Sequence, residues 1–203
     1  MNLHTKLILT DADGVLLAWE HAFDEWARAQ GYKKVRADEY GMNEKYNIPK
    51  KESQYLITKF NQSAWVGWIS PYRDAIKYVR KLHEEHGFIF RVITSFEQDM
   101  FSVRLREMNL HNTFGANVFD SIHCIGNQDK RDYLKPYEGT GCFFLEDKPS
   151  NADKAGPLGI QGVLFNHPYN KDHVNDDLIR VDNWKEFHDL AVNWESSPRM
   201  LLS

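Results

Sequence analysis

Four short apolar runs, each followed by polar residues, recur along the chain. They cover residues 6–10, 88–93, 142–145 and 162–165. Apolar runs of this length are typical of strands that are buried on both faces of a parallel sheet. Residues 118–125 are predicted to form a further strand. The pattern therefore indicates a buried sheet built from well-separated parts of the chain.

Segments with the spacing of amphipathic helices separate these runs. Helices are predicted over 18–30, 50–61, 72–86 and 98–108. The third is the clearest, because Ile76, Val79 and Leu82 fall on one face. Residues 36–47 are polar and show no clear pattern. Strands that alternate with helices predict an α/β fold with a doubly wound parallel sheet and right-handed crossovers.

The segment between the first strand and Pro71 differs from the rest of the chain. It is helical in pattern, and because it follows the carboxyl end of a strand we expect it to cover the crevice there as a cap. The predicted domains are an α/β core of residues 1–17 and 71–195, a helical cap of 18–70, and a frayed tail of 196–203. Phe23, Trp26 and Trp68 are expected to form the core of the cap.

The composition is that of a globular protein, with 42% hydrophobic and 27% charged residues among 203. No apolar run approaches a membrane span, and the first residues lack the apolar middle of a signal peptide, which favours a cytoplasmic protein without membrane contact. Cys124 and Cys142 lack metal-like spacing and are expected to be buried thiols. The net charge of −4 argues against a nucleic-acid polymer as partner, whereas a small anionic substrate remains possible.

Two carboxylates, Asp11 and Asp13, stand one residue apart at the end of the first strand, directly before Gly14. Ligands of open α/β sheets bind at the carboxyl ends of strands, so these carboxylates are expected to face a crevice. Because paired carboxylates repel each other, they favour a cation, a shared proton or both, and a divalent metal fits best. The alternative is that they are turn residues, since Asp and Gly are common where strands end.

Two further strands also end in polar pairs, Thr94-Ser95 and Glu146-Asp147. Hydroxyl groups bind phosphate oxygens, and carboxylates bind a hard cation such as Mg²⁺. The three strand ends together predict a site for metal-assisted phosphoryl transfer. Taken alone, Thr94-Ser95 could equally cap the next helix.

These features resemble the haloacid dehalogenase-like (HAD) phosphohydrolases, whose signature is a strand that ends in Asp-x-Asp-Gly-(Val/Thr)-(Leu/Ile). The resemblance implies a Rossmann-like core, with Asp11 as the nucleophile that forms an aspartyl-phosphate and Asp13 as the general acid and base. It also implies that Thr94 and Ser95 bind the phosphate. The Mg²⁺ ligands that it implies are Asp11, Asp13, Glu146 and Asp147, of which Asp147 is the favoured direct ligand.

The same resemblance implies a lysine that holds the nucleophile and the phosphate. Lys130 and Lys135 both precede the third strong strand at a suitable distance. We favour Lys130, because it opens a short helical pattern, and Lys135 stays open as the alternative. A lysine that is not used in this way would be an ordinary surface residue.

Three stretches resemble the 5′(3′)-deoxyribonucleotidase branch of these proteins. They are residues 68–75, residues 146–151 with 164–170, and residues 181–186. In that branch aromatic side chains sandwich the nucleobase, and Trp19 and Trp65 are the candidates here. Stacking on a base is worth about 1–3 kcal/mol per contact.

The function expected from the sequence is that of a Mg²⁺-dependent phosphomonoesterase that acts on (deoxy)nucleoside monophosphates. One alternative is a sugar-phosphate phosphatase or mutase of the same superfamily, which the Glu146-Asp147 pair favours. Another is a non-catalytic binding protein on the same scaffold. The intact Asp11, Asp13 and Asp147 argue against the last.

Overall fold

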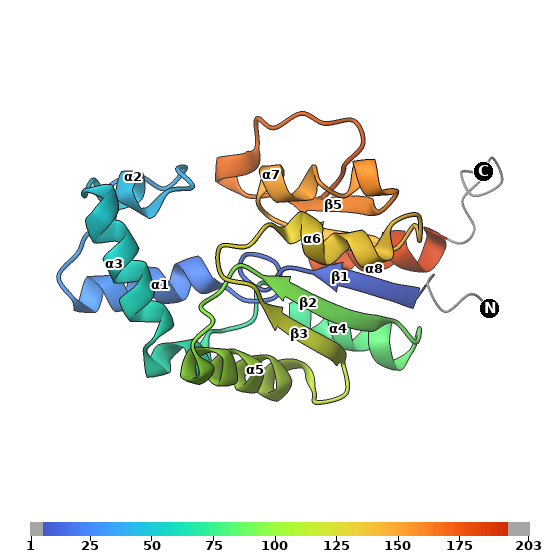
Figure 1. The fold of residues 1–203 in the computed structure, drawn as a ribbon, viewed down its shortest axis with the longest axis horizontal. Helices are drawn as coiled ribbons and strands as arrows, with labels where there is room; N and C mark the ends of the chain where they lie inside the picture. The colour runs from blue at the N-terminus through green and yellow to red at the C-terminus, as the bar shows by residue number, and fades with distance from the viewer. Residues whose placement is uncertain (1–5, 195–203) are drawn as a thin grey trace.

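The computed structural model describes residues 6–194, and its core is a six-stranded sheet (Figure 1). The strands are β1 (Leu7–Thr10), β2 (Ile89–Thr94), β3 (Phe119–Cys124), β4 (Phe143–Glu146), β5 (Gln161–Phe165) and β6 (Ile179–Val181). Their order is β3-β2-β1-β4-β5-β6, and every neighbouring pair is parallel. The predicted α/β fold with a doubly wound parallel sheet is confirmed. The short strand β6 was not predicted.

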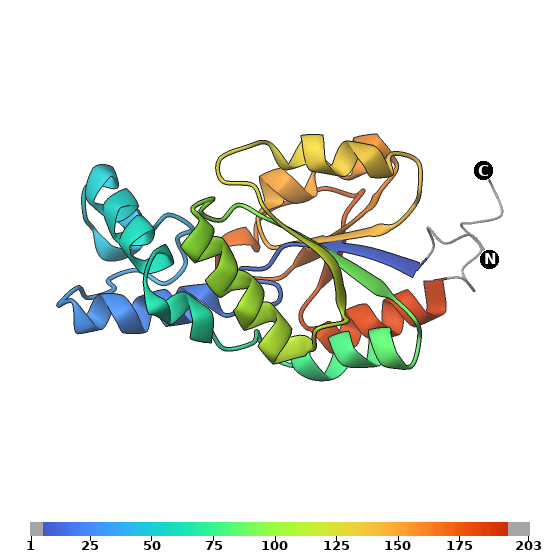
Figure 2. The same cartoon turned by 60° about the horizontal axis from the view of Figure 1, so that its bottom comes forward.

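Helices cover both faces of the sheet (Figure 2). The α-helices are α1 (Trp19–Ala29), α2 (Met42–Tyr46), α3 (Lys50–Asn61), α4 (Ala75–Glu84), α5 (Met100–Phe114), α6 (Lys130–Leu134), α7 (Pro149–Ala152) and α8 (Trp184–Asn193). The 3₁₀ helices are η2 (Ala64–Trp68), η3 (Lys135–Tyr137), η4 (Gly156–Leu158) and η5 (Pro168–Asn170). Side chains of β1 alternate between two apolar clusters, so that Ile8 packs on the side of α4, α5 and α8, whereas Leu7 and Leu9 pack on the side of α6.

The observed helices depart from the predicted ones at identifiable places. Helix α4 begins at Ala75 rather than at residue 72, because Tyr72 donates its backbone N–H to Leu16 O and is held beside the first loop. The buried face of α4 holds Ala75 with Val79 and Leu82, whereas Ile76, which was predicted to lie on this face, is 39% exposed. Helix α5 continues to Phe114, six residues beyond its predicted end, and α2 and α8 lie where no helix was predicted.

The segment between β1 and α4, here called the cap, holds α1, α2, α3 and η2 and lies at one end of the core (Figure 1). Its centre is aromatic, as predicted for Phe23, which is 1% exposed and packs edge-on against Phe60. Trp26 is half-buried against the same two rings. The prediction for Trp68 is wrong: its side chain is 78% exposed, because η2 turns its neighbours Val66 and Gly67 inward instead.

The sheet changes its winding direction between β1 and β4. From β1 the chain adds β2 and β3 on one side, and from β4 it adds β5 and β6 on the other. In open α/β sheets this switch point leaves a crevice beyond the carboxyl ends of the two strands, where ligands bind. The fold therefore places the ends of β1 and β4, with their acidic residues, at one position.

The structure also bears on the predictions for the cysteines and for membrane spans. Cys142 is buried and Cys124 is half-buried, and both are free thiols. Among residues 6–194 no helix is long and apolar enough to cross a membrane. The tail predicted over 196–203 lies outside the described residues.

Candidate active site

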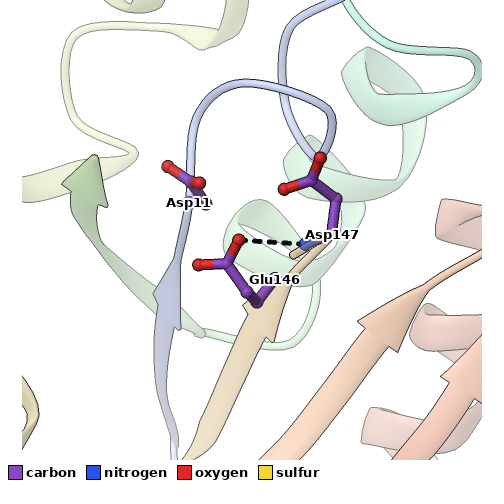
Figure 3. A group of neighbouring side chains, drawn as sticks. All are labelled: Asp11, Glu146 and Asp147. Atoms are coloured by element: carbon purple, nitrogen blue, oxygen red, sulfur yellow. Dashed lines mark hydrogen bonds between the residues drawn. The ribbon is translucent and has the colours of Figure 1, made fainter. Parts of the chain in front are cut away.

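Three buried carboxylates meet at the switch point (Figure 3). Asp11 follows β1, Glu146 ends β4 and Asp147 follows it, and one carboxylate oxygen from each lies within 4.8 Å of the others. The sheet itself sets this arrangement, since the Asp11 backbone N–H donates to Leu145 O at 2.8 Å and continues the pairing of β1 with β4. The two strand ends are thus held side by side with their carboxylates facing a common point.

Lys130 lies between two of these carboxylates. Its Nζ is 2.7 Å from Oδ2 of Asp11 and 2.7 Å from Oε2 of Glu146, and the residue is 1% exposed. Burial alone would lower the pKa of this ammonium, but the two carboxylates outweigh it and raise the pKa. Lys135, five residues later, is exposed. Of the two lysines considered from the sequence, the structure brings only Lys130 to the acidic cluster.

Glu146 and Asp147 are held in different ways. Glu146 is completely buried, and its Oε1 accepts the backbone N–H groups of Asp147 and Lys148 at 3.2 and 3.0 Å. The carboxylate of Asp147 accepts a hydrogen bond from the hydroxyl group of Tyr169 and packs against Gly14. A Cβ at position 14 would collide with this carboxylate, and the positive φ of 75° also favours glycine there. The Gly14 of the sequence motif is therefore required by a close approach.

Burial raises the pKa of both aspartates of the cluster. The pKa of Asp11 rises to about 6, against the opposing charge of Lys130, and that of Asp147 also rises to about 6, with Asp11 adding to the burial. Burial likewise raises the pKa of Glu146. Three carboxylates and one ammonium leave two formal negative charges. A divalent cation would neutralise them, and three carboxylates are the oxygen donors that Mg²⁺ prefers, so the residues fit this metal.

Asp13 does not lie in this group, although the sequence suggested it as a metal ligand. Its carboxylate binds Arg106 of α5, with Oδ1 accepting from Nη1 at 2.5 Å and Oδ2 from Nη2 at 3.1 Å. The Arg106 side chain is fully buried and stacks over the ring of Phe96 at 4.2 Å. Burial raises the pKa of Asp13, and Arg106 opposes the rise. Sequence reasoning missed Arg106, because an arginine in a helix gives no sign that it points inward.

Thr94 and Ser95 lie at the end of β2, next to β1, and line the same cavity as the acidic residues. Thr94 is 1% exposed and Ser95 is exposed. Neither caps the next helix, since Asp99 is the N-cap of α5 and accepts the Ser102 backbone N–H at 3.0 Å. The capping alternative is therefore wrong.

The cavity has a volume of about 600 Å³ and lies between the core and the cap. On the core side an aromatic stack joins Tyr72, His167 and Tyr169, with ring centroids 5.1 and 4.8 Å apart. Tyr40 of the cap packs edge-on against Tyr169 at 5.2 Å. All four rings line the cavity, and the sequence analysis named none of them as site residues.

The two tryptophans that were predicted to bind substrate lie in different parts of the structure. Trp19 lines the cavity, stacks on Phe23 with ring centroids 5.0 Å apart, and donates its Nε1–H to Asn61 Oδ1 at 2.9 Å. Trp65 is 47% exposed in η2 and is not among the residues that line the cavity. The structure therefore does not bring Trp65 to face Trp19 across a ligand.

Solved structures with a similar fold include haloacid dehalogenase-like hydrolases. The L-2-haloacid dehalogenase of Xanthobacter autotrophicus has a TM-score of 0.59 at 12% identity, with 92% of this chain and 98% of that one covered. A predicted phosphoglycolate phosphatase of Haemophilus somnus has a TM-score of 0.58 at 14% identity, with coverage of 92% and 98%. CbbY of Rhodobacter sphaeroides, solved with phosphate, has a TM-score of 0.56 at 16% identity, with coverage of 90% and 96%. The fold is that of the haloacid dehalogenase-like hydrolases, as the sequence resemblance predicted.

Two of the sequence relatives are named nucleotidases. The putative nucleotidase YqfW of Bacillus subtilis is 32% identical over 56% of this chain and 53% of its own length. A nucleotidase of Clostridium acetobutylicum is 28% identical over 57% of this chain and 65% of its own length. An uncharacterized 32.4 kDa protein of Enterobacteria phage T4 is 23% identical over 88% of this chain and 67% of its own length. The chain thus matches about half to two thirds of each relative, and no protein-family model matches it.

Proposed function

We propose that this protein is a Mg²⁺-dependent phosphomonoesterase that works through an aspartyl-phosphate on Asp11 and acts on nucleoside monophosphates, with deoxy forms preferred. The observation that carries the proposal is the buried cluster of Asp11, Glu146 and Asp147, neutralised in part by Lys130, at the switch point of the sheet. The same cavity holds Thr94 for the phosphate and an aromatic surface for a base. The nucleotidase names of the sequence relatives support the substrate class.

Asp11 and Asp147 would hold the metal, which would neutralise charge on the phosphate when bound. Glu146 would bind Lys130 and so orient it toward Asp11. In the first half-reaction an oxygen of Asp11 attacks phosphorus, the bond to the leaving oxygen breaks, and Asp13 gives that oxygen a proton. In the second half-reaction Asp13 takes a proton from water, the water oxygen attacks phosphorus, and Asp11 is released with inorganic phosphate.

Arg106 has a positioning role in this proposal. It binds both oxygens of Asp13, so Asp13 must exchange at least one of these hydrogen bonds for the leaving oxygen before it can donate a proton. The same pairing favours the carboxylate form that the second half-reaction requires. Arg106 thereby keeps Asp13 away from the metal ligands and available as a base.

In this proposal the cap side of the cavity binds the nucleobase. Trp19 presents a ring that is already fixed by Phe23 and Asn61, so stacking on it costs little side-chain entropy. Asn43 and Gln54 also line this side and offer amide groups to a base edge. Trp65 has no part in the proposed site.

A second candidate function is the hydrolysis of sugar phosphates. The Glu146-Asp147 pair and the polar groups of the cap side favour it, and a structure of similar fold was solved with xylulose 1,5-bisphosphate. Such a substrate would use the hydroxyl and amide groups of the cavity and leave Trp19 unused.

The test is a screen of phosphomonoesters with and without Mg²⁺, in which deoxynucleoside monophosphates are compared with ribonucleotides and hexose phosphates. We expect Mg²⁺-dependent release of phosphate, fastest from the deoxynucleotides. Faster hydrolysis of hexose phosphates would favour the second candidate. If no phosphomonoester is hydrolysed with Mg²⁺ present, the chain is a binding protein on this scaffold and the proposal is wrong.

A further inference from the structure

Helix α5 buries polar as well as apolar side chains and leaves several large apolar side chains exposed. Inside, Arg106 binds Asp13, and the Asn109 side-chain amide donates to the backbone carbonyls of Gly67 and Ile69 at 3.3 and 3.0 Å. Three apolar side chains of the same helix are exposed. They are Met100 (71%), Phe101 (73%) and Met108 (36%). The exposed face of a surface helix normally carries charged and polar side chains, so these exposed apolar side chains require a separate explanation.

The 3₁₀ helix η2 extends this apolar surface. Its Gly67 lies against α5, since a Cβ there would be 3.0 Å from Cε of Met108. On either side of Gly67, Trp65 is 47% and Trp68 78% exposed. Figures 1 and 2 both show α5 on the outside of the core, next to the turn that contains η2. We call Trp65, Trp68, Met100, Phe101 and Met108 the α5–η2 patch.

The size of this patch matches one side of a stable protein interface. A large side chain that is fully accessible has a surface of about 150–250 Å². With the exposed fractions of the five residues, the patch then presents roughly 450–750 Å² of accessible surface. A standard interface buries about 800 Å² on each partner, and monomers rarely expose apolar patches much above a few hundred Å². Large aromatic residues and methionine are also the residues enriched at the centres of interfaces.

The charges within the patch are self-complementary. Arg104 lies on α5 between Phe101 and Met108 and is exposed, and Glu107 is half-buried beside it. Neither forms an ion pair within residues 6–194. If two α5 helices pack antiparallel about a twofold axis between positions 104 and 105, Phe101 faces Met108 of the second copy. In that arrangement Arg104 is offset along the axis from Glu107 of the second copy by only about 3 Å, so two equivalent ion pairs form.

We propose that the α5–η2 patch is the interface of a twofold-symmetric homodimer of this chain. A twofold axis applies the same surface to both subunits, which a patch with its own opposite charges permits. The inner face of α5 holds Asp13 through Arg106 and η2 through Asn109, so dimerisation would fix α5 from the outside as well. This inference does not depend on the proposed chemistry.

The first experiment measures the mass of the full chain by sedimentation and light scattering over the micromolar range. We expect a dimer, and we expect Phe101→Glu to weaken it by about 30-fold or more in dissociation constant, the effect of losing one central interface residue. Val174→Glu is the matched control: Val174 is 84% exposed and lies outside the patch, so its dimer should persist. Circular dichroism and thermal unfolding would establish that both variants fold.

A charge exchange identifies the occupant as a second copy. Arg104→Glu should weaken the dimer, and the double variant Arg104→Glu with Glu107→Arg should restore it, because the pairs form between subunits. A monomeric wild-type chain throughout the micromolar range would overturn the proposal. So would a dimer that Phe101→Glu leaves unchanged, or binding to phosphatidylglycerol vesicles by a monomer through the same residues.

Discussion

The two sides of the cavity are built by different means. On the core side the functional groups stand at the ends of β1, β2 and β4, and hydrogen bonds between strands set their relative positions. On the cap side the groups project from short helices and are held by side chains, such as Trp19 by Phe23 and Asn61. The core side can therefore fix reacting groups accurately, whereas the cap side can vary without disturbing them.

This difference suggests a division of labour. Changes on the core side should affect the metal, the rate of the chemical step and the stability of the fold, because buried charges there depend on each other. Changes on the cap side should affect which substrate binds. The predictions below test this division, from the largest expected effect to the smallest.

Replacing Asp11 by Asn should abolish Mg²⁺-dependent hydrolysis of an aryl phosphate, since the amide cannot act as the nucleophile. The fold should persist, because the buried negative charge that is removed was itself costly. Circular dichroism and a phosphate-release assay measure the two effects. Asp176→Asn is the control, because Asp176 is exposed, and full activity in Asp11→Asn would show that another residue is the nucleophile.

Replacing Lys130 by Met should destabilise the metal-free protein by about 3–5 kcal/mol near neutral pH, because it leaves Asp11 and Glu146 buried without their cation. Urea unfolding measures the change. Lys135→Met, at an exposed position, should leave the free energy of unfolding nearly unchanged. Equal effects of the two variants would mean that the core side does not depend on this charge.

Mg²⁺ should stabilise the fold above about pH 6 and lose this effect as the pH falls. Burial raises the pKa of Asp11 and Asp147 from 3.8 to about 6, so between these values the folded state holds more protons than the unfolded state, and metal-free stability decreases as pH rises. Mg²⁺ competes with those protons. At 100 times its dissociation constant it should add about 2.7 kcal/mol at about pH 7.5 and much less at about pH 5.

Thermal unfolding with and without Mg²⁺ at the two pH values measures this stabilisation. Asp147→Asn should remove most of it, because Asp147 is a proposed direct ligand. An equal gain in stability at both pH values would show that the ion binds elsewhere.

Replacing Trp19 by Leu should lower kcat/KM for a nucleoside monophosphate by roughly 5- to 150-fold, the value of one stacking contact. The rate with a small phosphate that has no ring should stay within the error of the assay. Trp65→Leu is the matched control, since Trp65 lies outside the cavity. Equal losses for both kinds of substrate would mean that Trp19 only supports the fold of the cap, and the proposed division would fail.

The sequence by itself determined five of the six strands of the core, the acidic motif and the alternation of strands with helices, because these depend on local patterns. Runs of apolar residues indicate buried strands, and polar residues directly after them must lie at the edge of the sheet. The preference for Lys130 over Lys135 also rested on a local helical pattern. The structure places Lys130 beside Asp11 and leaves Lys135 exposed, and the catalytic role of Lys130 stays a prediction.

Only the tertiary structure decided which distant side chains meet. It paired Asp13 with Arg106, directed Tyr169 to Asp147, and placed Trp65 outside the cavity. Helix α5 shows why the sequence could not reveal this: it buries Arg106 and Asn109 beside apolar residues, whereas Phe101 and Met108 are exposed. Burial is a property of the packed molecule, so the polarity of a side chain alone does not tell which face of a helix turns inward.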